Sequence, residues 1–332
     1  MKKDAVFNLF GAFQEGVLLY SGIRFGILQR LGQSAATITE LVEVSSIPEE
    51  RLIRLLRGLC ACRIITADED GLFTLTPTGE AYLECEQSIL FQGSIAMKSW
   101  TFLDRFFETG QNPFVLANGD PVFDAIQKDE WLGEIFGHSW ASRTREFSAG
   151  IASLPLFKKV RTVIDIGGAE GQLLIDVLAT HPHLTGTVFD LPYCRTQFES
   201  ARAMFPCAER VAFCEGDFFG PIPAGADIYL MKWIIHDWDD ENAVRILENC
   251  RQAMGTESHL LILDRVVPEE FLASIPFAQA DLNMAAVNLG KERTRTEFAR
   301  ILDQAGLRLS AVHDFPNDLG LKIVEAVSRG QN

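Results

Sequence analysis

Short apolar segments alternate with helical segments between residues 160 and 267, and this rhythm constrains the fold more than any other feature. The apolar segments read RTVIDIG (161–167), TGTVFD (185–190), RVAFCEGD (210–217), ADIYLMKW (226–233) and HLLILDRVV (259–267). Helical patterns separate them at 171–180, 194–204 and 240–254. Such alternation predicts an α/β fold with a doubly wound, mostly parallel sheet.

Ligands of such sheets bind beyond the carboxyl ends of the strands. The residues that close the strands are therefore the first candidates for a binding site. In this sequence they are Gly167, Asp190, Asp217, Lys232 and Asp264.

The preceding half of the chain is mostly helical. Residues 37–83 predict two helices, with Ser46 capping the second toward Pro48, and then two short strands around the acidic turn ADEDG. This is a winged-helix pattern. We expect a mainly helical winged-helix domain at 1–100, a helical connector that contributes to the substrate pocket at 101–155, and a catalytic domain at 156–332. Apolar helices between residues 5 and 105 have no sheet to cover them, which predicts a homodimer formed through the N-terminal half.

Charge and composition narrow the partners. The 332-residue chain is 47% hydrophobic and carries a formal charge of −15, with a pI near 4.9. This charge repels nucleic acids and anionic membranes, so a small-molecule substrate is expected, with neither nucleic acid nor membrane as partner. Seven scattered cysteines without CxxC spacing favour the cytoplasm. The start of the chain predicts an amphipathic helix, and no apolar run is long enough to span a membrane.

The turn IDIGGAEGQ follows the first strand and opens a helix, so its free amides can approach a ligand. A dinucleotide fingerprint would need G-x-G-x-x-G, but Ala169 and Gly171 break that spacing, which makes NAD the weaker interpretation. The combination with later strand ends favours a nucleoside pocket. Asp190 stands where ribose hydroxyls need an acceptor, and Asp217 with Phe218 can face an adenine.

Six motifs occur in a specific order: VIDIGGAEG, FDLP, GDFF, ADIYLMKWIIHDWDDE, LILDRVVPE and GKERTRTEF. Over nearly the whole chain they resemble the class I S-adenosylmethionine-dependent O-methyltransferases of the caffeic-acid and hydroxyindole type. The resemblance implies a Rossmann-like catalytic domain behind a winged-helix dimerisation domain, S-adenosyl-L-methionine as cofactor with S-adenosyl-L-homocysteine as product, and no metal. It also implies cofactor-binding residues, namely Gly167, Asp190, Asp217, Phe218 and Lys232.

The resemblance further implies that His236 is the general base and that Asp264 and Glu292 flank it. Methyl transfer from a sulfonium needs an acceptor oxygen that has lost its proton and is aimed at the methyl group. An imidazole with an ordinary pKa of about 6.5 can take a phenol's proton near neutral pH. The sequence departs from the family at Ala169, a usual glycine, at Asp264, often glutamate, and at Trp140, often methionine.

Other conspicuous residues have weaker functional interpretations. The HPH sequence at 181–183 predicts a solvated loop rather than a metal site, since two side chains at i and i+2 diverge. Several aromatic and amide residues are expected to wall an acceptor pocket between the domains. They are Trp100, Phe106, Trp140, Phe277, Asn283 and Asn288.

Two alternatives remain at the level of the sequence. A winged-helix transcription regulator is disfavoured because Glu49 and Glu50 adjoin the arginines of the second helix and no basic face forms. A relative that methylates nitrogen or carbon, or that uses the sulfonium only as a fixed charge, would share all the motifs above.

Overall fold

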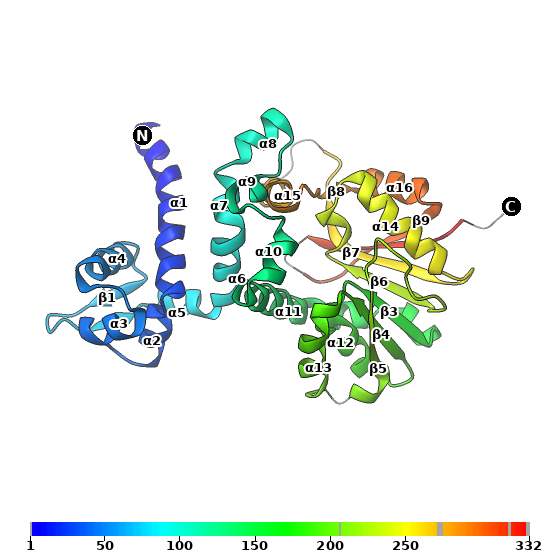
Figure 1. Cartoon of the computed structure of the whole chain (residues 1–332), viewed down its shortest axis with the longest axis horizontal. Helices are drawn as coiled ribbons and strands as arrows, with labels where there is room; N and C mark the ends of the chain where they lie inside the picture. Colours follow the sequence, from blue (N-terminus) through cyan, green and yellow to red (C-terminus); the bar gives the residue numbers. More distant parts are fainter. Residues whose placement is uncertain (1, 206, 271–274, 318–319, 330–332) are drawn as a thin grey trace. The chain divides into compact units, whose positions relative to one another are not determined.

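The computed structural model describes residues 2–205, 207–270, 275–317 and 320–329. It divides into two compact units, Met1–Lys98 and Ser99–Asn332 (Figure 1). Residues 101–155 lie within the second unit. None of the described helices is long and apolar enough to cross a membrane. All seven cysteines lie in the described part of the chain and are free thiols.

The first unit is a helical domain with a small β-hairpin. Its elements are α1 (Lys2–Arg24), α2 (Ile27–Gln33), α3 (Ile38–Ser45), α4 (Glu49–Ala61), β1 (Ile65–Ala67), β2 (Phe73–Leu75), α5 (Pro77–Glu84), α6 (Glu86–Phe91) and a π-helical turn at Gln92–Ala96. β1 and β2 pair in antiparallel fashion. The predicted order of two helices and a hairpin between residues 37 and 83 is therefore confirmed.

The helix boundaries in this unit follow local chemistry. The Thr37 side chain accepts from the Glu40 amide and the Glu40 carboxylate from the Thr37 amide, which forms a capping box at the start of α3. The expected cap at Ser46 is wrong. Ser46 ends α3 in the left-handed conformation (φ 55°), and α4 starts after Pro48 without a side-chain cap. Proline at this point supplies a preset φ and leaves one fewer amide to satisfy.

The second unit opens with helices and continues into an eight-stranded sheet. The helices before the sheet are α7 (Met97–Trp100), α8 (Leu103–Thr109), α9 (Pro113–Asn118), α10 (Val122–Lys128) and α11 (Glu130–Ala152), followed by a 3₁₀ turn, η2 (Pro155–Lys159). The strands are β3 (Thr162–Ile166), β4 (Thr185–Asp190), β5 (Val211–Glu215), β6 (Ile228–Lys232), β7 (His259–Val267), β8 (Arg293–Thr294), β9 (Leu307–Asp314) and β10 (Leu321–Ser328).

The strand order is β5-β4-β3-β6-β7-β10-β9, with β8 on the end of β7. All pairs from β5 to β7 are parallel, as is β7 with β8, whereas β10 runs antiparallel to β7 and β9. The prediction of a doubly wound, mostly parallel sheet is confirmed. The order reverses between β3 and β6, and such a switch point is where ligands of these sheets bind.

Helices cover both faces of this sheet (Figure 1). One core contains apolar side chains of α14 (Asp240–Ala253) and α16 (Arg295–Gln304), and the other those of α11, α12 (Gln172–Thr180) and α13 (Arg195–Arg202). β6 sends Tyr229 and Met231 into the first core and Ile228 and Leu230 into the second. Burial on both faces explains why β6 is an unbroken apolar run rather than an alternating one. The remaining helix, α15 (Ile275–Asn288), precedes β8.

Candidate active site

The glycine turn after β3 is held tightly against the next strands. Gly167 has φ 68°, and a side chain there would meet the Ile234 side chain at 2.3 Å. Only glycine satisfies both conditions. The Asp190 carboxylate at the end of β4 accepts from the amides of Ala169 and Leu191, both at 2.7 Å. Asp190 therefore fixes the turn, and each oxygen still has a lone pair for a further donor.

Ala169 affects the backbone of this turn. It adopts φ 50°, a left-handed conformation that costs an L-residue about 1 kcal/mol relative to glycine. Replacing the usual glycine therefore strains the main chain of this turn.

Two charged residues, Asp165 in β3 and Lys232 at the end of β6, lie next to the glycine turn in the sheet. Sequence reasoning did not single out Asp165. Asp165 of β3 is 1% exposed, and neither carboxylate oxygen has a hydrogen-bond partner within the described residues. Burial raises its pKa to about 7, although the Lys232 ammonium opposes the shift. Burial likewise lowers the pKa of Lys232 to about 8, against the attraction of Asp165 and Asp264. An acid inside an otherwise apolar strand was the signal in the sequence that could have identified Asp165.

Asp217 and Phe218 lie beyond the end of β5. Asp217 is two residues past the strand rather than its closing residue, and its side chain is exposed except for a bond from the Phe219 amide at 2.8 Å. The Phe218 ring is 3.8 Å from the position a side chain would take at Gly167, and it meets Trp238 edge-on with 6.0 Å between centroids. Phe218 is thus next to the glycine turn, as a residue facing a nucleoside must be.

His236 lies in a 3₁₀ turn, η5 (Ile235–Asp237), just after β6 and 4% exposed. Its Nδ1 is 3.3 Å from Glu292 Oε1, and its Nε2 is 3.6 Å from Asp237 Oδ1. The same Glu292 oxygen accepts from Arg265 Nη1 at 2.8 Å. The Glu292 amide donates to Asp281 at 2.9 Å. The structure therefore brings His236 and Glu292 together and adds Asp237 and Arg265, which sequence reasoning did not single out.

The electrostatics of this cluster differ from the ordinary histidine assumed from sequence. Burial alone lowers the pKa of His236, but the carboxylates of Glu292, Asp237 and Asp264 outweigh it and raise the pKa to about 9. For Glu292, burial acts to raise the pKa, but the His236 imidazole and the Arg265 guanidinium outweigh it. The pKa of Glu292 is therefore below its usual value. The expected unperturbed pKa of 6.5 is wrong, because three acids surround one imidazole.

Asp264 lies within β7 rather than at its end, because β7 continues to Val267. Its side chain is fully buried, neither oxygen has a hydrogen-bond partner in the described chain, and burial raises its pKa to about 7. Asp264 acts on His236 through its charge and not through a hydrogen bond. Asp237 is instead held by the Asn288 amide, and burial raises its pKa to about 6.

The residues expected to wall an acceptor pocket are dispersed over the second unit. Asn288 reaches the histidine cluster through Asp237. Trp100 Nε1 donates to Asn283 at 3.0 Å, so these two form one polar contact. Trp140 packs against Trp233, with ring centroids 4.6 Å apart.

The remaining two aromatic candidates lie elsewhere. Phe106 is half-buried beside Phe107, and Phe277 is half-buried over Gly320. The structure links Asn288 to His236 through Asp237. It also links Trp140 to the Trp238 ring, through ring contacts of Phe136 and Phe123.

The segment 181–183 is a turn in which Pro182 and His183 are exposed, as expected, but His181 is not solvated. His181 is buried, its Nε2 lies 2.7 Å from the Ala152 carbonyl oxygen, and its ring meets His183 edge-on. His183 Nε2 lies 3.1 Å from the Phe157 carbonyl oxygen. Both rings tie the end of α12 to the end of α11 and to η2. Among residues 2–205, 207–270, 275–317 and 320–329, no group of three or more His, Cys, Asp or Glu side chains is arranged to hold a metal.

Comparison with known proteins agrees with this architecture. The O-methyltransferase domain family matches residues 100–308. The chain is 32% identical to O-methyltransferase SfmM3 of Streptomyces lavendulae, over 92% of this chain and 94% of that protein. Mitomycin 7-O-methyltransferase MmcR superposes with a TM-score of 0.92 at 28% identity, covering 99% and 98% of the two chains.

A third similar protein was solved with small molecules bound. It is O-methyltransferase NcsB1 from neocarzinostatin biosynthesis, in complex with S-adenosyl-L-homocysteine and 1,4-dihydroxy-2-naphthoic acid, with a TM-score of 0.85, 26% identity and coverage of 95% and 96%. The family match and the relative above 30% identity settle the classification. The chain belongs to the class I S-adenosylmethionine-dependent O-methyltransferases of the caffeic-acid and hydroxyindole type.

Proposed function

We propose that the protein transfers a methyl group from S-adenosyl-L-methionine to a phenolic hydroxyl of a small aromatic metabolite, with His236 as general base. The observation that carries this proposal is the contact of 3.3 Å between His236 Nδ1 and Glu292 Oε1. A carboxylate on one ring nitrogen fixes the tautomer and leaves the other nitrogen to take a proton.

Residues at and beyond the carboxyl ends of β3 to β6 fit the cofactor. The close approach at Gly167 leaves no room for a side chain at that position, and the two carboxylate oxygens of Asp165 that lack a partner in the described chain leave buried acceptor capacity beside Lys232. Gly167, Asp190, Asp217, Phe218 and Lys232 would hold it, with Asp190 accepting from the ribose and Phe218 facing the adenine. When bound, the cofactor supplies an electrophilic methyl on a positive sulfur.

The side chains of the protein then have to remove one proton, that of the acceptor hydroxyl. With a pKa of about 9, the imidazole is protonated at neutral pH and must lose that proton before it can accept another. A positive charge bound nearby disfavours the imidazolium and lowers this pKa. Glu292 and Asp264 then stabilise the imidazolium that forms when His236 takes the acceptor's proton. The neighbouring Asp237 lies 3.6 Å from Nε2.

An aromatic acceptor is supported by one relative and by the side chains near the base. NcsB1 was solved with 1,4-dihydroxy-2-naphthoic acid. In this chain we assign the acceptor wall to Trp100, Phe106, Trp140, Phe277, Asn283 and Asn288. Asn288, held on Asp237, is the member nearest the base by its contacts.

The decisive experiment incubates the protein with S-adenosyl-L-methionine carrying a labelled methyl group. The acceptors are 1,4-dihydroxy-2-naphthoic acid, caffeic acid and, as a nitrogen control, 4-aminobenzoate. We expect label on a hydroxyl oxygen of at least one phenol, found by mass spectrometry, and none on the amine. Label only on nitrogen or carbon would contradict the proposed acceptor chemistry.

We also propose that activity needs no metal and that the protein is a homodimer through its N-terminal unit. Exposed apolar side chains of α1, Phe13 and Val17, support the second point. Turnover should be unchanged after dialysis against EDTA. Sedimentation at micromolar concentration should give a dimer, and a monomer would contradict this assignment.

A further inference from the structure

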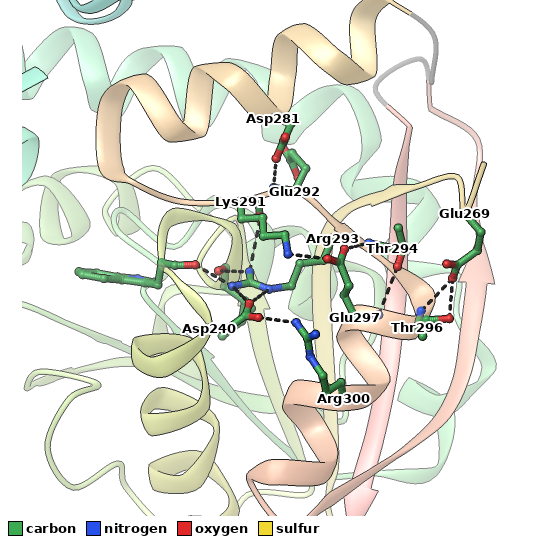
Figure 2. A network of polar contacts seen from close by, with 12 residues as sticks. Asp240, Glu269, Asp281, Lys291, Glu292, Arg293, Thr294, Thr296, Glu297 and Arg300 are labelled. Carbon is green, nitrogen blue, oxygen red and sulfur yellow. Dashed lines mark hydrogen bonds and ion pairs between the residues drawn. The ribbon is translucent and has the colours of Figure 1, made fainter. Parts of the chain in front are cut away.

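Arg293 is the largest side chain that is fully buried in the described chain. Its guanidinium donates mainly to residues 235–240, with one longer bond of 3.3 Å to the Lys291 carbonyl oxygen. Nη1 donates to the carbonyl oxygen of Ile235 at 2.8 Å, and Nη2 donates to that of Trp238 at 2.7 Å. Nε donates to Asp240 at 3.0 Å (Figure 2). Ile235 and Trp238 flank His236 on either side.

A guanidinium is suited to this position. The 3₁₀ turn at Ile235–Asp237 is short, so the Ile235 carbonyl oxygen receives only a long bond of 3.4 Å from the Trp238 amide. Buried carbonyl groups need donors. A planar fork with several fixed N–H groups reaches two carbonyls at once, whereas an ammonium on a flexible stem does not hold the same geometry.

The residues just before Arg293 hold the same turn. The Lys291 amide donates to the His236 carbonyl oxygen at 2.8 Å. A side chain at Gly290 would come within 2.2 Å of that oxygen, so the backbones are in close contact there. Glu292 lies against the imidazole and Arg293 against the main chain on both sides of it. The side chains of two consecutive residues, Glu292 and Arg293, therefore contact the His236 ring and the main chain beside it.

The segment that carries these groups is itself anchored. Arg293 pairs through β8 with β7, where it lies opposite Val266. Thr294 caps α16 in a capping box with Glu297, and Lys291 forms an ion pair with Glu297. Glu269 accepts from the amide and the hydroxyl of Thr296, both at 2.9 Å (Figure 2).

Arg293 forms its ion pair outside the histidine cluster, although its positive charge also acts to lower the pKa of Asp264. The Asp240 carboxylate, in the first turn of α14, receives Arg293 at one oxygen and Arg300 at the other. Arg300 is half exposed, whereas Arg293 is fully buried. Arg300 therefore offers a matched comparison, because it shares the Asp240 partner but makes no hydrogen bond to the histidine turn in the described chain.

We propose that Arg293 is a positioning residue for the base: its guanidinium fixes the main chain on both sides of His236 and thereby holds the imidazole against Glu292. The inference rests on the proposed function in one respect, the role of His236 as base. The position of the ring is a separate property that can be measured in the ligand-free protein.

The test uses the full chain with Arg293→Lys, and Arg300→Met as the control. Histidine is labelled with ¹³C in its ring, the six resonances are titrated by NMR, and His236→Gln identifies the resonance of interest. In Arg293→Lys we expect the His236 titration to move from about 9 toward the ordinary 6.5, because the ring leaves Glu292. Arg300→Met should keep the wild-type titration.

Turnover gives a second readout. With S-adenosyl-L-methionine and 1,4-dihydroxy-2-naphthoic acid, kcat of Arg293→Lys should fall about 10- to 100-fold, the scale of a misplaced catalytic group, while cofactor affinity changes little. The double variant His236→Ala with Arg293→Lys should lose no more than His236→Ala alone. A merely structural role predicts that the two losses multiply.

Two results separate this inference from the proposed function. An unchanged His236 titration in folded Arg293→Lys, or losses that multiply in the double variant, would overturn the positioning role. Retained turnover in His236→Ala would instead overturn the base, whatever the titration shows. If Arg293→Lys does not fold, Asp240→Asn removes the carboxylate that orients the guanidinium. It should shift the titration in the same direction, and no shift would count against the proposal.

Discussion

Two carboxylates of the catalytic unit, Asp190 and Glu292, are held by different kinds of donor. Asp190 accepts from two backbone amides, those of Ala169 and Leu191. Glu292 shares one oxygen between the imidazole of His236 and the guanidinium of Arg265. Amides keep their protons at any physiological pH, whereas an imidazole does not.

Under the proposed function, this difference separates a site that binds the cofactor from a site that moves a proton. The glycine turn and Asp190 form a site whose donors are fixed by main-chain geometry. The His236 cluster is a balance of charges in which three acids act on one base. We therefore expect changes at the first site to alter affinity, and changes at the second to alter turnover and pH dependence.

The largest effect should come from removing the base. His236→Ala should lower kcat about 10²- to 10⁴-fold, the usual contribution of a positioned general base, and leave cofactor affinity nearly intact. Steady-state kinetics and calorimetry measure the two quantities. The loss should shrink as the pH nears the acceptor's own pKa, since a phenolate needs no base. Near-normal turnover at neutral pH would remove His236 from this role.

Substituting the acids that flank His236 should lower kcat less than substituting His236 itself. Glu292→Gln removes a bond between charged groups, which corresponds to about 1.5–3 kcal/mol, or roughly 10- to 150-fold in kcat. Asp264→Asn should lose less than Glu292→Gln because no hydrogen bond joins Asp264 to His236 in the described chain. Neither loss should add fully to that of His236→Ala. Fully multiplicative losses would show that the three residues act on separate steps.

At the binding site, Asp190→Ala should weaken cofactor affinity by about 1.5–3 kcal/mol, because a charged acceptor is lost. Isothermal calorimetry measures this change directly. Asp190→Asn is the matched control, since it keeps the shape of the side chain. An unchanged dissociation constant in Asp190→Ala would exclude this residue from the binding site.

The charge balance also predicts a pH dependence of stability. A histidine whose folded pKa of about 9 exceeds its unfolded value stabilises the protein below about 6.5 and loses this contribution as the pH rises through 9. This contribution makes the melting temperature fall between pH 7 and 9.5, whereas Lys232, whose pKa burial lowers to about 8, acts in the opposite direction in wild type and variant alike. His236→Gln should flatten this limb in differential scanning calorimetry, and equal slopes in both proteins would contradict the charge balance.

The smallest effect concerns the strained turn. Ala169→Gly removes a left-handed alanine that costs about 1 kcal/mol, but glycine loses part of that gain in backbone entropy. We expect a net gain of about 0.5 kcal/mol in the free energy of unfolding by denaturant titration. Gly167→Ala tests the opposite sign. It should lower the free energy of unfolding, because alanine is strained at the left-handed φ of 68° and its methyl group would also press on the Ile234 side chain.

Sequence reasoning identified most of the secondary structure that carries the site. The segment 226–233 contains β6 (Ile228–Lys232), and 259–267 coincides with β7. Buried parallel strands are short apolar runs, which are visible without any knowledge of their neighbours. The motif order likewise identified the family before any contact was known.

The same reasoning failed where a residue's surroundings come from distant parts of the chain. The pKa of His236 depends on acids at positions 237, 264 and 292, which only the pairing of β6, β7 and β8 brings together. Asp165 and Arg293 received no role from the sequence, because only the packed structure shows that their side chains are buried. The burial of His181 likewise depends on α11 and η2, which precede it in the chain.

The amino-acid order by itself determined the alternation of strands and helices, the glycine turn and the identity of the residues at the strand ends, since these depend on local periodicity and backbone freedom. Only the tertiary structure decided which of those residues meet, which acids lack partners and which cation holds the histidine turn. The physical reason is that burial and charge proximity set the energy of an ionisable group, and both arise when segments more than 50 residues apart, such as His236 and Glu292, are packed together.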